Sequence, residues 1–299
     1  MTSPEKFSEN PPITVVVTGA KGKMGTTLLK TLCTTPEIKV VGVTTRQVNP
    51  GETVGDWLNL KTPESTNTNN TEPHKIQTAL LQLPFSDALT DLLSETQPDV
   101  CVDLTTPDSV FANAITMINA DVRPVIGTTG LTSEQLTLLD EQLTQKGLGG
   151  LVVPNFALGA VLMMKFAQLA AKYMPHAEII ERHHNQKADA PSGTALKTAA
   201  LMQDAQSHFG QTNATETESH PGARGAKART GQSDAIHIHS VRLPGSLAHQ
   251  EVLFGAPGQT LRIQHDTIDR TCFMSGIVLC IHKVLALKGL TYGMENLIE

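Results

Sequence analysis

The feature that most constrains the fold is a glycine-rich turn that directly follows the first apolar run of the chain. Residues 13–18 (ITVVVT) form a β-branched run, and the turn GAKGKMG at 19–25 leads into a helical pattern at 24–31. Short apolar runs and helical patterns then keep alternating through the first half of the 299 residues. Continuous apolar strands that alternate with helices indicate a parallel sheet covered on both faces.

The remaining elements of this half follow the same rhythm. Strands are expected at 38–43, 100–104, 124–126 and 151–153, and helices at 87–95 and 107–120. Thr132 precedes Gln135 by three residues, and this capping-box spacing predicts the start of another helix.

After residue 155 the pattern changes. A long helix is expected at 159–174, a strand at 177–181 and a helix at 192–208, before longer alternating strands at 235–243, 251–255 and 261–265. An apolar helix at 272–287 is expected to close the chain and return to the first half. The sequence therefore predicts an α/β protein. Its N-terminal Rossmann-like parallel-sheet domain spans 1–156 and is completed by a C-terminal helix in 270–299. Its C-terminal α+β domain spans 157–269 and has a mixed or antiparallel sheet.

Composition and charge narrow the range of partners. The formal net charge is −6, so the chain has no overall basic field for nucleic acid, although this leaves room for a local basic pocket for a small anion. No apolar stretch reaches the ~20 residues of a membrane span, and the N-terminus lacks the apolar core of a secretory signal. The four cysteines form no C-x-x-C pair and are expected to be reduced thiols of a cytoplasmic protein. Polar segments at 62–73 and 208–234 are expected on the surface, and the sequence assigns them no role.

The turn at 19–25 has the chemistry of a dinucleotide site. Glycine permits a tight turn and a close approach of the backbone to a pyrophosphate, and the helix N-terminus offers unpaired N–H groups to that anion. The glycines stand at Gly19, Gly22 and Gly25, which is a variant of the usual G-x-G-x-x-G spacing. A plain strand-to-helix turn is the alternative, but the position at the first strand of an alternating pattern favours the dinucleotide.

The end of the second strand bears on cofactor choice. Domains that bind NAD often place a carboxylate there, whereas this chain has Thr45 followed by Arg46, whose guanidinium suits a 2′-phosphate. Lys21 and Lys23 add positive charge. NADPH is therefore the expected cofactor, with NADH tolerated, unless Arg46 is only a solvated surface residue.

The segment ERHHNQKADAPSGTA at 181–195 carries the densest chemistry. The amides of Gly193 and Thr194, with the hydroxyls of Ser192 and Thr194, offer an anion site at the start of a helix. His183 and Lys187 can supply protons or positive charge where negative charge develops. Adjacent histidines on a strand point to opposite faces, so His184 need not share the role of His183.

Other classes of protein remain open from these residues alone. A zinc hydrolase would use His183, His184, His237 and His239, although no H-E-x-x-H spacing occurs and no metal site is expected. A dinucleotide-sensing module would explain the first half but not the segment at 181–195. A sugar dehydrogenase is a third alternative, but the P-S-G-T turn with Lys187 favours a dicarboxylate over a neutral sugar.

The segment at 181–195 closely resembles the signature of the dihydrodipicolinate reductase family, E-x-H-H-x-x-K-x-D-A-P-S-G-T-A. The resemblance covers nearly the whole chain and includes the loop at 19–25, Asp103-Leu104-Thr105, the runs 125–130 and 238–242, Asn155-Phe156 and residues 270–273. It implies NAD(P)H-dependent reduction of 4-hydroxy-tetrahydrodipicolinate to tetrahydrodipicolinate, in diaminopimelate and lysine biosynthesis. It also implies a homotetramer that assembles through sheets of the second domain.

The resemblance implies residue roles as well. His183 would be the proton donor, with Lys187 assisting as an acid or substrate anchor, and His184, Gly193 and Thr194 would bind the substrate's carboxylates. Backbone of thirteen residues would hold the dinucleotide: Gly19, Ala20, Lys21, Gly22, Lys23, Met24, Gly127, Thr128, Thr129, Val153, Pro154, Asn155 and Phe156. This chain departs from the family in two places. Thr45 stands where relatives that use NADH well often carry an acid, and Lys21 stands where many relatives have glycine.

Overall fold

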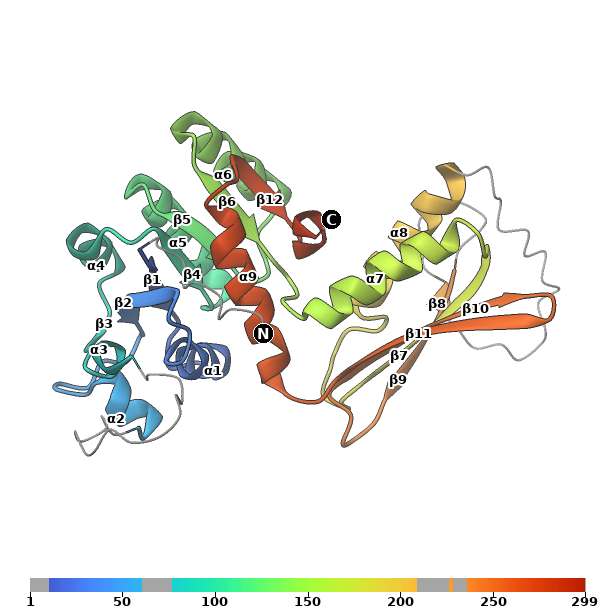
Figure 1. Ribbon diagram of the computed structural model, residues 1–299, viewed down its shortest axis with the longest axis horizontal. Coiled ribbons are helices and arrows are strands. Elements are labelled where there is room, and N and C mark those ends of the chain that lie inside the picture. Colours follow the sequence, from blue (N-terminus) through green and yellow to red (C-terminus); the bar gives the residue numbers. More distant parts are fainter. Residues whose placement is uncertain (1–10, 61–76, 209–225, 228–235, 299) are drawn as a thin grey trace, which may run out of the picture. The chain divides into compact units, whose positions relative to one another are not determined.

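The computed structural model describes residues 11–60, 77–208, 226–227 and 236–298, and the chain falls into two compact units. One unit consists of Met1–Phe156 with Gly276–Glu299, and the other of Ala157–Ser275. Each unit has its own sheet (Figure 1). The two polar segments expected at 62–73 and 208–234 lie outside the described residues, apart from His208 and the two-residue strand β8.

The first unit is built on seven parallel strands in the order β12-β6-β5-β4-β1-β2-β3. Their bounds are β1 (Ile13–Thr18), β2 (Ile38–Thr44), β3 (Phe85–Ser86), β4 (Val100–Asp103), β5 (Arg123–Ile126), β6 (Gly149–Val152) and β12 (Gly289–Tyr292). The chain runs from β1 to β3 on one side and then crosses to β4 on the other side of β1. In open α/β sheets, ligands bind beyond the carboxyl ends of the strands at such a switch point.

Helices connect these strands and cover the sheet. They are α1 (Lys23–Leu32), α2 (Val54–Leu58), α3 (Thr78–Leu81), α4 (Leu89–Thr96), α5 (Pro107–Asn119), α6 (Ser133–Lys146), α9 (Met274–Val284) and the short η2 (Met294–Leu297). Neighbouring helices α5 and α6 bury Val110, Ile118 and Leu143 against Ile126 of β5 and Val152 of β6. The capping box expected at Thr132 is confirmed, because the Thr132 hydroxyl accepts from the Gln135 amide while the Gln135 side chain accepts from the Thr132 amide.

The end of the chain corrects the expectation of a closing helix at 272–287. The 3₁₀ turn η1 (Arg270–Phe273) precedes α9, which ends at Val284, and the strand β12 then joins the sheet beside β6. The amide of Leu290 donates to Asp140 on α6 at 2.7 Å. The strand β12 (GLTY) contains no continuous apolar run, so it has little local signal, and its position is fixed by pairing with β6.

The second unit contains one mixed sheet in the order β11-β10-β7-β9-β8, with α7 (Leu158–Ala171) and α8 (Gly193–His208) along one side (Figure 1). The strands are β7 (His176–His183), β8 (Ala226–Lys227), β9 (His237–Arg242), β10 (Ala248–Ala256) and β11 (Gln259–Thr267). Ile179, Val252 and Phe254 form the core with alanines and Met202 of the two helices. The predicted fold class is confirmed. However, β9 and β10 are not neighbours, because β7 lies between them, parallel to β9 and antiparallel to β10.

The described part of the chain has no helix that is both long and apolar enough to span a membrane.

Candidate active site

The residues expected to bind the cofactor lie beyond the carboxyl ends of four strands of the first sheet. They are Gly19, Ala20, Lys21, Gly22, Lys23 and Met24 after β1, Thr45 and Arg46 after β2, Gly127, Thr128 and Thr129 after β5, and Val153, Pro154, Asn155 and Phe156 after β6. Because parallel strands end at the same edge of a sheet, the fold brings all of these residues to one edge, around the switch between β1 and β4.

The glycine turn after β1 is shaped by its own backbone. Gly19 adopts φ +72°, and a Cβ there would lie 2.5 Å from the carbonyl oxygen of Leu104. A Cβ on Gly25 would lie 2.3 Å from the carbonyl oxygen of Gly19. Gly22 is exposed as the residue before α1, and no side chain caps this helix N-terminus. The turn therefore leaves helix amides accessible to an anion, which is what a pyrophosphate requires.

The Lys21 ammonium has partners within the first unit. Its Nζ atom lies 2.5 Å from Oε2 of Glu52 and donates to the carbonyl of Gln47, and its ammonium stands 4.5 Å from the centre of the Phe85 ring. The side chain is only 12% exposed. Its charge is therefore compensated within the unit, where it ties the glycine turn to the segment after β2.

Arg46 and Lys23 remain exposed at this edge. The Arg46 guanidinium donates to the hydroxyl of Thr106 at 2.7 Å, which carries it from the end of β2 toward the residues that follow β4. Thr45 is partly buried, and its amide donates to the carbonyl of Ser86.

Asp103, at the end of β4, is a buried carboxylate to which the sequence assigned no role. It accepts hydrogen bonds from the backbone amide and the hydroxyl of Thr105, from the Thr128 hydroxyl at 3.0 Å and from the side-chain amide of Asn113 at 2.8 Å. One carboxylate therefore holds the turns after β4 and β5 together.

The turns after β5 and β6 also touch. A Cβ on Gly127 would lie 2.7 Å from the Phe156 ring, and the amide of Val153 donates to the carbonyl of Ile126. Phe156 is buried, whereas Thr129 and Pro154 are exposed.

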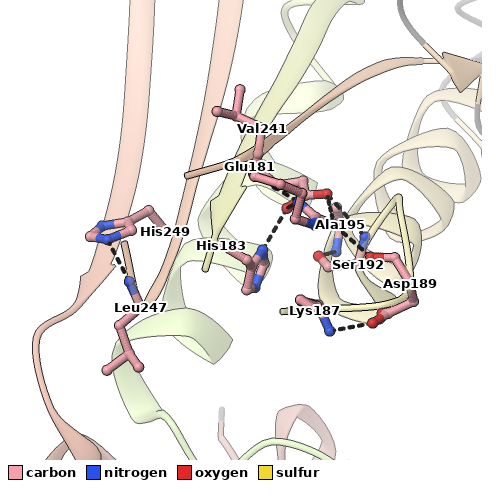
Figure 2. A network of polar contacts seen from close by, with 10 residues as sticks. Glu181, His183, Lys187, Asp189, Ser192, Ala195, Val241, Leu247 and His249 are labelled. Carbon is pink, nitrogen blue, oxygen red and sulfur yellow. Dashed lines mark hydrogen bonds and ion pairs between the residues drawn. The ribbon is translucent and has the colours of Figure 1, made fainter. Parts of the chain in front are cut away.

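In the second unit, the segment at 181–195 is organised around a fully buried carboxylate. Glu181 lies on β7 two residues before His183, so both side chains are on the same face of the strand. Oε2 of Glu181 is 2.5 Å from Nδ1 of His183, and Oε1 accepts from the Ser192 amide at 3.3 Å (Figure 2). The opposite charge comes from Arg242 on β9, which donates to both carboxylate oxygens at 2.9 Å.

This environment shifts both titrating groups. Burial alone would raise the pKa of Glu181, but hydrogen bonds from Arg242, Ser240 and His183 together hold the pKa below its usual range. Burial lowers the pKa of His183, with help from the positive charges of Lys187 and Arg242, and the Glu181 contact opposes this without reversing it. His183 is therefore mainly neutral at pH 7 before any anion binds.

The rest of the segment surrounds this group. Lys187 forms an ion pair with Asp189 at 2.7 Å (Figure 2). The Ser192 hydroxyl caps α8 by accepting from the Ala195 amide at 3.2 Å. Gly193 is exposed at the start of α8, Thr194 is partly exposed, and His184 lies just beyond the end of β7.

The structure brings His183 and Ser192, which the sequence named separately, to one carboxylate, and it adds Glu181 and Arg242 to the site. Glu181 carried a signal, because residues two apart on a strand share a face. No sequence signal relates Arg242 to His183, because the pairing of β7 with β9 brings the two residues together.

His237 and His239 alternate with the buried Ile238 and so lie on the face opposite Glu181 and His183. Among the described residues, no group of three or more His, Cys, Asp or Glu side chains could hold a metal ion.

Comparison with known proteins finds matches to one enzyme family in both halves of the chain. A family model described as "Dihydrodipicolinate reductase, N-terminus" matches residues 13–156, and one described as "Dihydrodipicolinate reductase, C-terminus" matches 159–298. Proteins named 4-hydroxy-tetrahydrodipicolinate reductase are similar over 96% of this chain. The one from Lysinibacillus sphaericus is 46% identical with 99% of its own length covered, and the one from a Nostoc species is 44% identical with 98% covered.

Solved structures give the same result. A dipicolinate-bound dihydrodipicolinate reductase from a Paenisporosarcina species is 41% identical and superposes with a TM-score of 0.75, over 96% of this chain and 100% of that one. An amine dehydrogenase from Mycobacterium smegmatis, 15% identical with a TM-score of 0.59, shares the fold alone. Both halves of the chain match the two halves of one enzyme family, and the chain therefore belongs to the dihydrodipicolinate reductases.

Proposed function

We propose that this oxidoreductase reduces 4-hydroxy-tetrahydrodipicolinate to tetrahydrodipicolinate with NADPH, in the route to diaminopimelate and lysine. The reaction agrees with the names of its full-length relatives. The observation that carries the proposal in this chain is the segment at 181–194, where His183 and the Ser192 amide at the start of α8 contact one buried carboxylate and Lys187 lies beside them (Figure 2). Such a site suits a small dianion.

The pyridine nucleotide fits the carboxyl edge of the first sheet. The residues from Gly19 to Met24 would hold its pyrophosphate at the start of α1, where glycine allows the backbone to approach. The turns at Gly127–Thr129 and Val153–Phe156 would line the nicotinamide end. When bound, this group supplies the hydride.

The preference for NADPH rests on Arg46. No carboxylate follows β2 to accept from a ribose 2′-hydroxyl, and the exposed Arg46 guanidinium suits a 2′-phosphate. Lys21 contributes less, because Glu52 compensates its charge. We expect Arg46→Gln to raise KM for NADPH about tenfold, the loss of roughly one charged hydrogen bond, with KM for NADH unchanged. An equal change in both KM values would contradict this role.

On the second unit, His184, the Ser192 hydroxyl, Gly193 and Thr194 would bind the substrate's carboxylates. Loss of the 4-hydroxyl as water would first give a dihydrodipicolinate, in which C4 is conjugated to the imine. Negative charge then builds on the ring as hydride arrives at C4. His183 would donate a proton to the ring, and Lys187 would stabilise the charge or assist the transfer. General acid assistance of this kind contributes roughly 10²–10⁴-fold in rate.

The test is NADPH oxidation with substrate generated in situ from pyruvate and aspartate semialdehyde by the preceding enzyme. We expect turnover by the wild type, with kcat lowered at least ~10²-fold in His183→Ala and Lys187→Ala and KM for NADPH nearly unchanged. Absence of turnover in the wild type would overturn the function. Unchanged kcat in both variants would overturn the residue roles.

We also propose a cytoplasmic homotetramer. Cys33, Cys101, Cys272 and Cys280 are all free thiols, as suits a reducing compartment. The face of the second sheet opposite α7 and α8 carries Ile180, which is 37% exposed, and this face is the proposed assembly surface. Light scattering should report a mass near four copies of the 32.0 kDa chain.

A further inference from the structure

Glu181 is unusual among the described acidic residues of the second unit, because its side chain is fully buried while its neighbours belong to the proposed active site. The carboxylate has 0% exposure, compared with 57% for Glu178 on the same strand. A buried carboxylate is costly unless it is paired and hydrogen-bonded. Arg242 supplies the charge through two parallel N–H bonds, a geometry that also fixes the plane of the carboxylate.

The same pair reaches three segments of the chain. Glu181 contacts His183 at the end of β7 and the Ser192 amide at the start of α8. Arg242 donates in addition to the carbonyl of Asp189 at 2.6 Å, within the loop that carries Lys187. A shift of this pair would therefore change the contacts of the His183 ring, the start of α8 and the loop that carries Lys187.

We infer that Glu181, held in place by Arg242, is the positioning residue of His183 in the proposed reduction. It accepts the Nδ1–H of the imidazole and so fixes both the ring orientation and the tautomer, which leaves Nε2 for the substrate. The inference rests on the proposed function, since it concerns the proton donor of that reaction. Neither Glu181 nor Arg242 is proposed to contact the substrate.

The geometry indicates a His183 ring that is fixed in orientation and tautomer, rather than one that is permanently charged. In a neutral imidazole one nitrogen donates and the other accepts, and the partner of the first decides which is which. The ionised Glu181 carboxylate can only accept a hydrogen bond, so Nδ1 of His183, which lies 2.5 Å from it, carries the hydrogen. The Arg242 charge compensates Glu181, and Asp189 compensates Lys187. A dianionic substrate would then add the charge that favours protonation of Nε2, in the place where the proton is needed.

The first test measures the tautomer without any reaction. Solid-state ¹⁵N NMR of histidine-labelled wild-type protein at about pH 8, with the His183 resonances assigned by their loss in His183→Gln, should show hydrogen on Nδ1. In Glu181→Gln the Nε2–H form should gain population. Hydrogen on Nε2 of His183 in the wild type would overturn the inference.

The second test is a double-mutant cycle on kcat. Glu181→Gln should lower kcat about 10²-fold in the wild-type background, the scale of a lost general acid, but less than about threefold in the His183→Gln background. KM for NADPH should stay within twofold throughout. An equal loss in both backgrounds would show that Glu181 does not act through His183 and would overturn the inference.

Two further variants keep this cycle informative. If Glu181→Gln does not fold, Glu181→Asp keeps the charge for Arg242 while drawing the carboxylate back from His183, and the same non-additivity is expected. Asp204→Asn is the matched control, because it removes the carboxylate partner of His208 at the exposed end of α8 and should leave kcat unchanged. If the wild type shows no turnover with NADPH, the proposed function fails. The tautomer of His183 is measured without any reaction, so that result alone does not decide the role of Glu181.

Discussion

Gly193 occupies a position where the fold itself makes no demand for glycine. An added Cβ would meet no other described atom within 4 Å. Gly193→Ala should therefore leave the free energy of unfolding unchanged or raise it by up to about 1 kcal/mol, the helix preference of alanine over glycine. Urea unfolding measures this effect.

The same substitution should weaken substrate binding if a carboxylate contacts the backbone at Gly193. A methyl group forced into a filled contact costs roughly 1–3 kcal/mol, so KM for the dicarboxylate should rise about tenfold or more, with KM for NADPH as the internal control. An unchanged KM for the dicarboxylate would remove Gly193 from the substrate site.

His183 should link stability to pH. Its pKa in the folded protein lies below the usual 6.5, mainly because of burial, so the folded state binds fewer protons than the unfolded state near that pH. Stability from this group is present above the unfolded pKa and is lost as pH falls through the folded one. Between about pH 7.5 and 5.5, the wild type should lose more unfolding free energy than His183→Gln. Equal losses would mean that His183 is not shifted. Glu181 acts at lower pH, because its pKa also lies below the usual 4.5.

At this scale the sequence predicts residue types better than partners. His183 and Lys187 stand out from the run at 181–195, and Glu181 could have been added from the two-residue period of a strand. Arg242 could not, because it reaches Glu181 through the pairing of β7 with β9, 61 positions along the chain. The ion pair of Lys21 with Glu52 has no sequence signal for the same reason, since the two residues are 31 positions apart.

The last strand offers a test of how elements are fixed by tertiary contact. Gly289, at the start of β12, adopts φ +72°, and a Cβ there would lie 2.7 Å from Oδ1 of Asp140. Gly147, after α6, has a similar φ of +66° with no described atom within 4 Å of such a Cβ. Both alanine variants carry the cost of a left-handed residue, about 1–2 kcal/mol, but only Gly289→Ala also displaces the acceptor of the Leu290 amide.

We therefore expect Gly289→Ala to destabilise the protein by roughly 1 kcal/mol more than Gly147→Ala, about one hydrogen bond. Chemical unfolding of the two variants side by side gives the difference. Equal destabilisation would show that the Asp140 contact does not help to hold β12.

Elements with strong local signals are the ones that the sequence predicts. The capping box at Thr132 and the proline at the start of α5 both mark helix starts that the structure has. The strand β3, with two residues, and the strand β12, which has no continuous apolar run, are missed because neighbouring strands rather than local pattern define them. The place of β7 between β9 and β10 is likewise a property of pairing and has no sequence signal.

For the whole molecule, the assembly surface can be tested by charge. If the open face of the second sheet forms the tetramer, Ile180→Glu buries an unpaired carboxylate there and should convert the protein to smaller species in light scattering. Leu169→Glu, on α7 and 53% exposed, is the matched control and should leave the mass unchanged. If Leu169→Glu lowers the mass and Ile180→Glu does not, the tetramer forms through the helices and not through the sheet.

The strand β12 also has a consequence for biosynthesis. The unit formed by Ala157–Ser275 is continuous in the chain, whereas the other unit recruits Gly276–Glu299 into a sheet begun at residue 13. On the ribosome, which delivers the N-terminus first, the inserted unit has all of its residues while the nucleotide-binding sheet still lacks an edge. Emergence of β12 at 289–292, rather than of the N-terminal half, therefore sets the moment at which that sheet can be completed.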